Sequence, residues 1–125
     1  MDLDKAIRTR HSCRRFTTKK PNWRDIIEAI DSANLAPLAG NIPTLKFILI
    51  TEDDKIKQLS EACQQDFVGT AKFVVVVCTN PSQSTRSYGE RGKKYAAEQA
   101  GAAIENFLLK ITSLGLATCW VGAFS

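Results

Sequence analysis

The chain has 125 residues, 44% of them hydrophobic and 24% charged, and its formal net charge is +4 at pH 7. This length suits one domain with a modest core, and the composition is that of an ordinary globular protein. No apolar run approaches the roughly 20 residues that span a bilayer. The charged N-terminus MDLDKAIRTR also lacks the apolar segment of a signal peptide. We therefore expect a soluble, cytoplasmic protein.

The cysteine pattern argues against a metal site and against a disulfide framework. Zinc sites need clustered cysteine and histidine ligands, but the chain has one histidine and its cysteines are widely spaced. Disulfides are not expected in a cytosolic chain with this much apolar sequence. We predict no bound metal, and at least three buried free thiols among Cys13, Cys63, Cys78 and Cys119.

The first half of the chain shows two helical patterns and one strand. A short helix is expected over 3–9, and 17–22 reads as a turn. Asn22 is a good N-cap for a helix over 23–35, because its side chain can accept from free amides of the first turn. The stretch 38–44 is a loop of small side chains, and LKFILI (45–50) is typical of a strand.

The second half begins with a helix over 55–63. Four consecutive valines in 71–79 indicate a strand that is buried on both faces. Turn-forming residues predict an exposed loop over 80–92. A long helix over 93–115 follows, with Gly115 at its C-terminal end, and 116–124 reads as a buried strand. Helices and strands in this order predict an α+β domain of two or three layers.

Three short stretches carry residues suited to binding a ligand. Arg10, Ser12 and Arg14 alternate, so an extended segment would point them to one side, where they could hold a phosphate. Asn41 follows Gly40 in a loop that a flat ligand could approach, and Gly122 follows an apolar stretch. Each also has a simpler reading: a solvated charge run, an ordinary turn and a strand bulge.

Together the three stretches resemble the nitroreductase family of FMN-dependent NAD(P)H oxidoreductases. RHSCRRF (10–16) is similar to the family's opening motif R-[RH]-S-x-[RK]-x-F, and APLAGNIPTLKFILI (36–50) resembles its APSAGNxQPWxFxV segment. AAEQAGAAIENFLLKITSLGLATCWVGAF (96–124) resembles its long central helix and the strand that follows. The segments occur in the family's order and spacing over nearly the whole chain.

The resemblance implies a fold and a domain organisation. Residues 1–125 are expected to form a single FMN-binding domain of three layers. This α+β fold would have a mixed, mainly antiparallel sheet flanked by helices. Family members continue beyond the position of the final predicted strand, so the fold is expected to be shortened at its C-terminus.

The resemblance also implies which residues contact FMN. Arg10 matches the arginine at the FMN phosphate, Ser12 the serine near the ribityl chain and phosphate, and Arg14 the basic residue at the N1/O2 edge of the ring. His11 is expected to make a backbone contact in the same turn. Asn41, with the backbone of Leu38 and Ala39, matches the loop that reaches FMN from a partner subunit. Gln99 matches a position on the central helix that can offer an amide to the cofactor. Trp120, Val121 and Gly122 match the strand end that lies against the flavin ring.

The implied activity is ping-pong transfer of hydride from NADH or NADPH, through flavin N5, to a nitroaromatic, quinone or similar acceptor. No catalytic side chain is required, because the flavin supplies the chemistry. A homodimer with two FMN is expected, with the small-residue face of helix 93–115 as its interface. Two alternatives stay open: a flavin-binding module without turnover and, more distantly, a nucleic-acid-binding protein, suggested by the positive charge.

Overall fold

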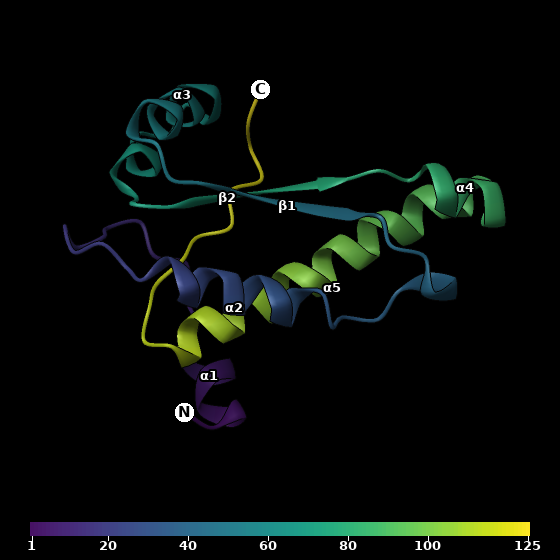
Figure 1. Cartoon of the computed structure of the whole chain (residues 1–125), viewed down its shortest axis with the longest axis horizontal. Coiled ribbons are helices and arrows are strands. Elements are labelled where there is room, and N and C mark those ends of the chain that lie inside the picture. Colours follow the sequence, from purple (N-terminus) through teal and green to yellow (C-terminus); the bar gives the residue numbers. More distant parts are fainter.

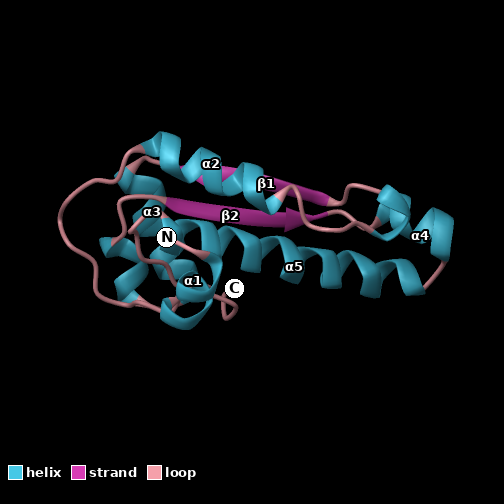
Figure 2. Ribbon diagram, turned by 90° about the horizontal axis from the view of Figure 1, so that it is seen from below, coloured by secondary structure: helices cyan, strands magenta, loops and turns pink.

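A computed structural model describes all 125 residues. The chain folds mainly into helices packed around a small sheet. The long helix α5 (Arg91–Ser113) runs along most of the molecule, beside a two-stranded antiparallel sheet (Figure 2). The other elements are α1 (Leu3–Thr9), α2 (Trp23–Ala33), β1 (Leu45–Ile50), α3 (Asp53–Cys63), β2 (Val74–Thr79) and α4 (Ser82–Tyr88), with single 3₁₀ turns at Ala39–Asn41 and Asp66–Thr70.

The two N-terminal helices begin where capping side chains satisfy free backbone amides. The Asp2 carboxylate accepts from the Lys5 N–H at 2.8 Å, and the Asn22 side chain accepts from the Arg24 N–H at 3.0 Å. The helix predicted over 3–9 is confirmed, and the helix predicted from residue 23 also begins there but ends at Ala33.

The sheet separates two layers of helices. Strand β1 pairs with β2 in antiparallel register, from Leu45 opposite Thr79 to Ile50 opposite Val74. Helices α2 and α5 lie on one side of the strands and α3 lies on the other (Figure 1). This arrangement confirms the predicted α+β class with helices on both sides of the sheet.

The core lies between α2, α5 and the sheet. One cluster contains Ile26, Ala29 and Ile111, and a second contains Ala33, Ala36 and Ala103. Alanines at the second contact leave little side-chain volume between the end of α2 and the middle of α5. Only 16 of the 125 residues are buried, so much apolar surface stays exposed on this chain.

The prediction of a buried strand over 116–124 is wrong. This segment forms one isolated parallel bridge, Ser12 to Thr118, and no ladder. Its apolar side chains are not buried, since Trp120 is 53% exposed and Phe124 is 68% exposed. An apolar sequence becomes a strand only where a neighbouring backbone offers a continuous row of partners, and here the neighbouring segment pairs at a single position.

Three further expectations are corrected. Residues 82–88 form α4 rather than a loop. Pro81 is the N-cap residue, and the Asn80 side chain just before it accepts from both the backbone N–H and the hydroxyl of Ser82. Strand β2 starts at Val74 and its valines are half-buried. No cysteine is buried: Cys78 is exposed and the other three are of intermediate exposure.

None of the helices combines the length and the apolar character needed to cross a membrane.

Candidate functional site

Two segments far apart in the sequence meet beside the C-terminal half of α5. After α1 the backbone runs on through Arg10, and the Cys13 N–H donates to the carbonyl of Thr118 at 2.8 Å. The resulting bridge places Ser12 next to Thr118. The structure thus brings the basic stretch 10–14 together with the segment 118–122, two of the three stretches singled out in the sequence.

The polar side chains of the basic stretch make few contacts within the chain. Arg10 forms a long ion pair, with its Nε 3.6 Å from Glu105 Oε1, and both side chains are partly exposed. The Arg14 guanidinium carbon lies 6.0 Å from the centre of the Phe67 ring and has no carboxylate partner. The Ser12 side chain is exposed, and its hydroxyl has no hydrogen-bond partner in the chain. These donors remain available to an anionic ligand.

His11 lies in the same turn and is exposed. Its Nδ1 is 3.1 Å from the carbonyl oxygen of Thr9. This is a contact of the imidazole and not of the His11 backbone. The expected backbone contact of His11 with the cofactor stays a prediction.

The segment 120–122 also carries unpaired donors. The backbone N–H groups of Trp120, Val121 and Gly122 have no acceptor within the chain. Trp120 and Gly122 are exposed and Val121 is half-buried. An unpaired amide at a surface is satisfied by water or by a ligand, so these three amides are available to a ligand.

An apolar cavity of about 860 Å³ adjoins these segments. Val75 of β2, Phe107 and Ile111 of α5, and all three residues of the segment 120–122 line it. Arg10, Ser12 and Arg14 do not line it. Its lining is mainly apolar but also includes the cationic residues Arg15, Lys19 and Lys72. The cavity could therefore take a ligand that carries both an aromatic ring and an anionic group.

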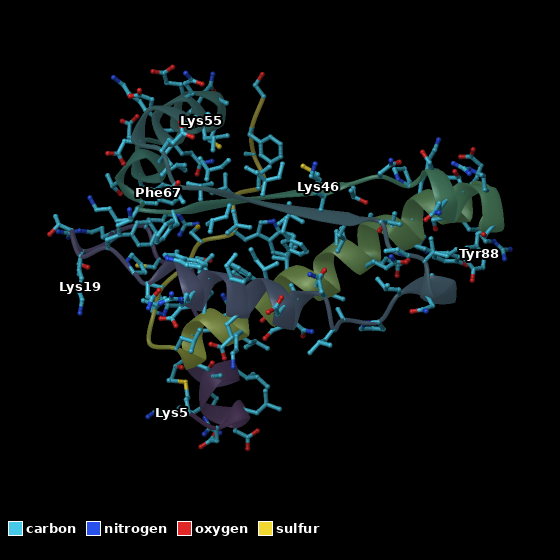
Figure 3. All side chains as sticks on the ribbon, viewed as in Figure 1. Lys5, Lys19, Lys46, Lys55, Phe67 and Tyr88 are labelled. Carbon is cyan, nitrogen blue, oxygen red and sulfur yellow. The ribbon has the colours of Figure 1, made fainter.

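The third stretch lies elsewhere in this chain. The turn Ala39–Asn41 and α4 are at one end of the longest axis, and the segment that follows α1 lies toward the other (Figure 1). The labelled side chains of Tyr88 and Phe67 mark these two regions (Figure 3). Leu38 and Ala39 are half-buried and Asn41 is exposed. One chain does not bring this loop to the basic stretch.

The Gln99 side chain is directed at that loop and is 5% exposed. Its amide accepts from the Ala39 N–H at 2.9 Å and donates to the Ile42 carbonyl and the Thr44 hydroxyl at 3.2 and 3.1 Å. Each polar atom therefore has a partner inside the protein, and the amide expected at the cofactor serves the loop.

Sequence reasoning missed the residues that surround this loop. The Tyr88 ring lies against Gly40, so that a methyl group on Gly40 would collide with its hydroxyl. Asn41, Ile42 and Pro43 face Gln83, Arg86 and Ser87 of α4 across a recess of about 400 Å³. The signal that could have revealed α4 was the pair Asn80-Pro81, since Pro81 is the N-cap residue and the Asn80 side chain accepts from the Ser82 N–H.

The sequence also matches known proteins over almost its entire length. Two overlapping matches to the model described as "Nitroreductase family" cover residues 7–67 and 59–125. A putative NADH dehydrogenase/NAD(P)H nitroreductase of Archaeoglobus fulgidus is 31% identical over 121 residues. That alignment covers 96% of this chain and 67% of the relative.

Solved structures show the same fold. A nitroreductase family protein from Clostridium novyi NT superposes with a TM-score of 0.89 at 25% identity, covering 100% of this chain and 72% of that one. A BluB-like flavoprotein from Clostridium difficile 630 gives a TM-score of 0.82 at 25% identity, covering 98% and 75%. With the family matches spanning residues 7–125, the chain belongs to the nitroreductase family.

Proposed function

We propose that the chain is an oxidoreductase domain that binds FMN and passes hydride from NADH or NADPH to a small electron acceptor such as a nitroaromatic or quinone. Family membership supports the oxidoreductase class, and the Archaeoglobus relative carries the name of a NAD(P)H nitroreductase. The Clostridium difficile structure is that of a flavoprotein, which favours a flavin cofactor here. The proposed order is ping-pong, with donor and acceptor using one pocket in turn.

One observation carries the proposal: the Ser12–Thr118 bridge joins the segment of cationic side chains to the segment whose backbone N–H groups at 120–122 have no acceptor. Arg10 and Arg14 would hold the phosphate and the N1/O2 edge of the ring, and Ser12 would donate to the phosphate or the ribityl chain. Guanidinium groups suit this task because their fork of N–H donors matches phosphate oxygens. The residues present therefore fit the group.

Trp120, Val121 and Gly122 would lie against the ring, with their amides oriented toward its polar edge. FMN, when bound, supplies the hydride chemistry itself. The protein's contribution is to bind, orient and partly cover the ring. The positive charge of Arg14 would favour the anionic reduced form over the neutral one.

A homodimer is part of this proposal. The loop 38–41 lies away from the basic stretch within one chain, so a second copy would have to bring Asn41 and the backbone of Leu38 and Ala39 to the cofactor. On α5, Ala97 is exposed and nothing lies within 4 Å of a Cβ at Gly101, so a second chain could approach closely there. The chain also exposes apolar side chains on α1 and α2 that a second copy could cover: Leu3, Ile7, Trp23 and Ile27.

The test is an absorbance spectrum of the purified protein with FMN, recorded before and after anaerobic addition of NADH or NADPH. Flavin bands that bleach would support the proposal and show which nucleotide is used. Bands that persist would overturn hydride transfer and leave a flavin-binding module. A protein that retains no FMN after gel filtration would overturn the cofactor assignment.

A further inference from the structure

The side-chain amide of Gln99 ties three points of the segment 39–44 to helix α5. Its Oε1 accepts from the N–H of Ala39, and its Nε2 donates to the carbonyl of Ile42 and to the hydroxyl of Thr44. The partners lie 55 to 60 residues away in the sequence. One buried group therefore holds both ends of the turn.

The two backbone partners fix the orientation of this amide. A backbone N–H can only donate, so Oε1 must face Ala39, and a carbonyl can only accept, so Nε2 must face Ile42. No other common side chain of this length offers an acceptor and two donors in one plane. Glutamate lacks the donors at neutral pH, and methionine lacks both functions.

The segment that Gln99 holds has an unusual backbone. Gly40 and Asn41 are consecutive left-handed residues, with φ values of 59° and 57°. Side chains disfavour this region, although asparagine tolerates it better than most. Within the turn the backbone forms only two hydrogen bonds, Asn41 N–H to Leu38 and Ile42 N–H to Ala39. Contacts from outside must select this conformation.

Tyr88 supplies a second contact from α4. Its ring packs against Gly40 and makes an edge-to-face contact with Tyr95, with ring centres 5.2 Å apart. Tyr95 lies one turn before Gln99 on α5, so the two side chains leave the helix on the same side. Helices α4 and α5 thus enclose the turn from two directions.

We propose that Gln99 is a positioning residue that keeps residues 38–44 in the conformation in which Ala39 and Asn41 can meet the flavin. This inference rests on the proposed function, because it takes the loop as part of the FMN site. Gln99 does not touch the cofactor. It raises FMN affinity by populating the binding-competent loop before the ligand arrives.

The experiment compares Gln99→Met with Asn106→Leu in the same chain. Asn106 is the matched control, because it lies on the same helix and its amide also donates to a backbone carbonyl, that of Ser32 on α2 at 3.2 Å. FMN affinity is measured by titration at a temperature where both variants are folded. Hydrogen exchange is measured on peptides covering 36–45 in the absence of FMN.

We expect Gln99→Met to weaken FMN binding about tenfold and to speed amide exchange over 38–44. Asn106→Leu should leave both readouts near wild type while lowering thermal stability. Gln99→Glu keeps the acceptor for the Ala39 N–H and loses the donors, so Ala39 exchange should stay near wild type while exchange over 42–44 rises. This variant carries the test if Gln99→Met does not fold.

Faster loop exchange with unchanged FMN affinity would overturn the inference and leave Gln99 a structural residue only. An equal loss of affinity in Asn106→Leu would also overturn it, because general destabilisation would then explain the effect. A wild-type chain that binds no FMN would instead refute the proposed function, and this inference with it. The exchange data would still report whether the amide holds the loop.

Discussion

The two halves of α5 meet their surroundings in opposite ways. Beside the first half, Gln99 pairs every polar atom of its amide with the loop, and Tyr88 closes over Gly40. Beside the second half, Ser12, Arg14 and the amides of 120–122 have no hydrogen-bond or ion-pair partner within the chain. In the first region the polar atoms of the Gln99 amide are all paired within the chain. The second keeps donors that a ligand can use.

The difference shows how one chain can divide its polar groups between structure and binding. A buried polar group left unpaired costs free energy, so the buried amide of Gln99 must be paired internally. Exposed groups at the basic stretch bear no such cost, because water satisfies them until a ligand arrives. Substitutions in the first region should therefore change stability most, and those in the second should change affinity most.

The largest expected effect follows from removing both cations of the basic stretch. Hydrogen bonds to charged groups contribute about 1.5–3 kcal/mol each, so Arg10→Met/Arg14→Met should weaken FMN binding about a thousandfold. Stability should change little, because both side chains are partly or fully exposed.

The matched control is Lys5→Met/Arg8→Met, which removes the same charge from exposed positions on α1. It should reduce affinity by no more than about threefold, through the weaker long-range field. Equal losses in the two double variants, measured by FMN titration at fixed salt, would mean that net charge and not position controls binding.

A stability effect of intermediate size is expected where α4 packs on α5. A Cβ at Gly92 would lie 2.5 Å from backbone atoms of Ser84 and Thr85, so Gly92→Ala must push the two helices apart. We expect a loss of about 2 kcal/mol in the free energy of unfolding, after the gain in helix propensity is included.

Gly101→Ala on the same helix serves as the comparison, because no atom lies within 4 Å of the added carbon. In the monomeric chain this variant should gain about 0.5–1 kcal/mol, so the comparison is made at protein concentrations below those at which the chain dimerises. Urea unfolding of the two variants measures the difference. If Gly92→Ala were as stable as Gly101→Ala, the close contact between α4 and α5 would be wrong.

The smallest effect is expected from Glu105→Gln. The carboxylate of Glu105 competes with a ligand for Arg10, but the pair is long and half-exposed and contributes little to folding. We expect FMN to bind about two- to threefold more tightly, with thermal stability within error of wild type. Weaker binding in this variant would show that Glu105 orients Arg10 for the phosphate.

Local patterns predicted most of the elements. Asn22 caps the helix that begins at residue 23 as predicted, and 45–50 forms a strand over the predicted residues. The prediction of a loop over 80–92 was wrong because its polar residues suit a short helix as well as a turn, and the helix begins after Pro81. The prediction of a buried strand over 116–124 was wrong because strand formation depends on a partner backbone that the local sequence does not specify.

For the candidate site, the sequence by itself determined the residue types and their order: alternating donors in 10–14, a small-residue loop with Asn41, and a glycine after the apolar stretch that ends at Val121. These follow from side-chain chemistry and spacing along one segment. Only the tertiary structure decided that 10–14 lies beside 118–122, that the loop lies apart from both, and that Gln99 serves the loop. Those facts depend on contacts between residues 55 to 106 positions apart, and a local sequence pattern does not predict contacts over such separations.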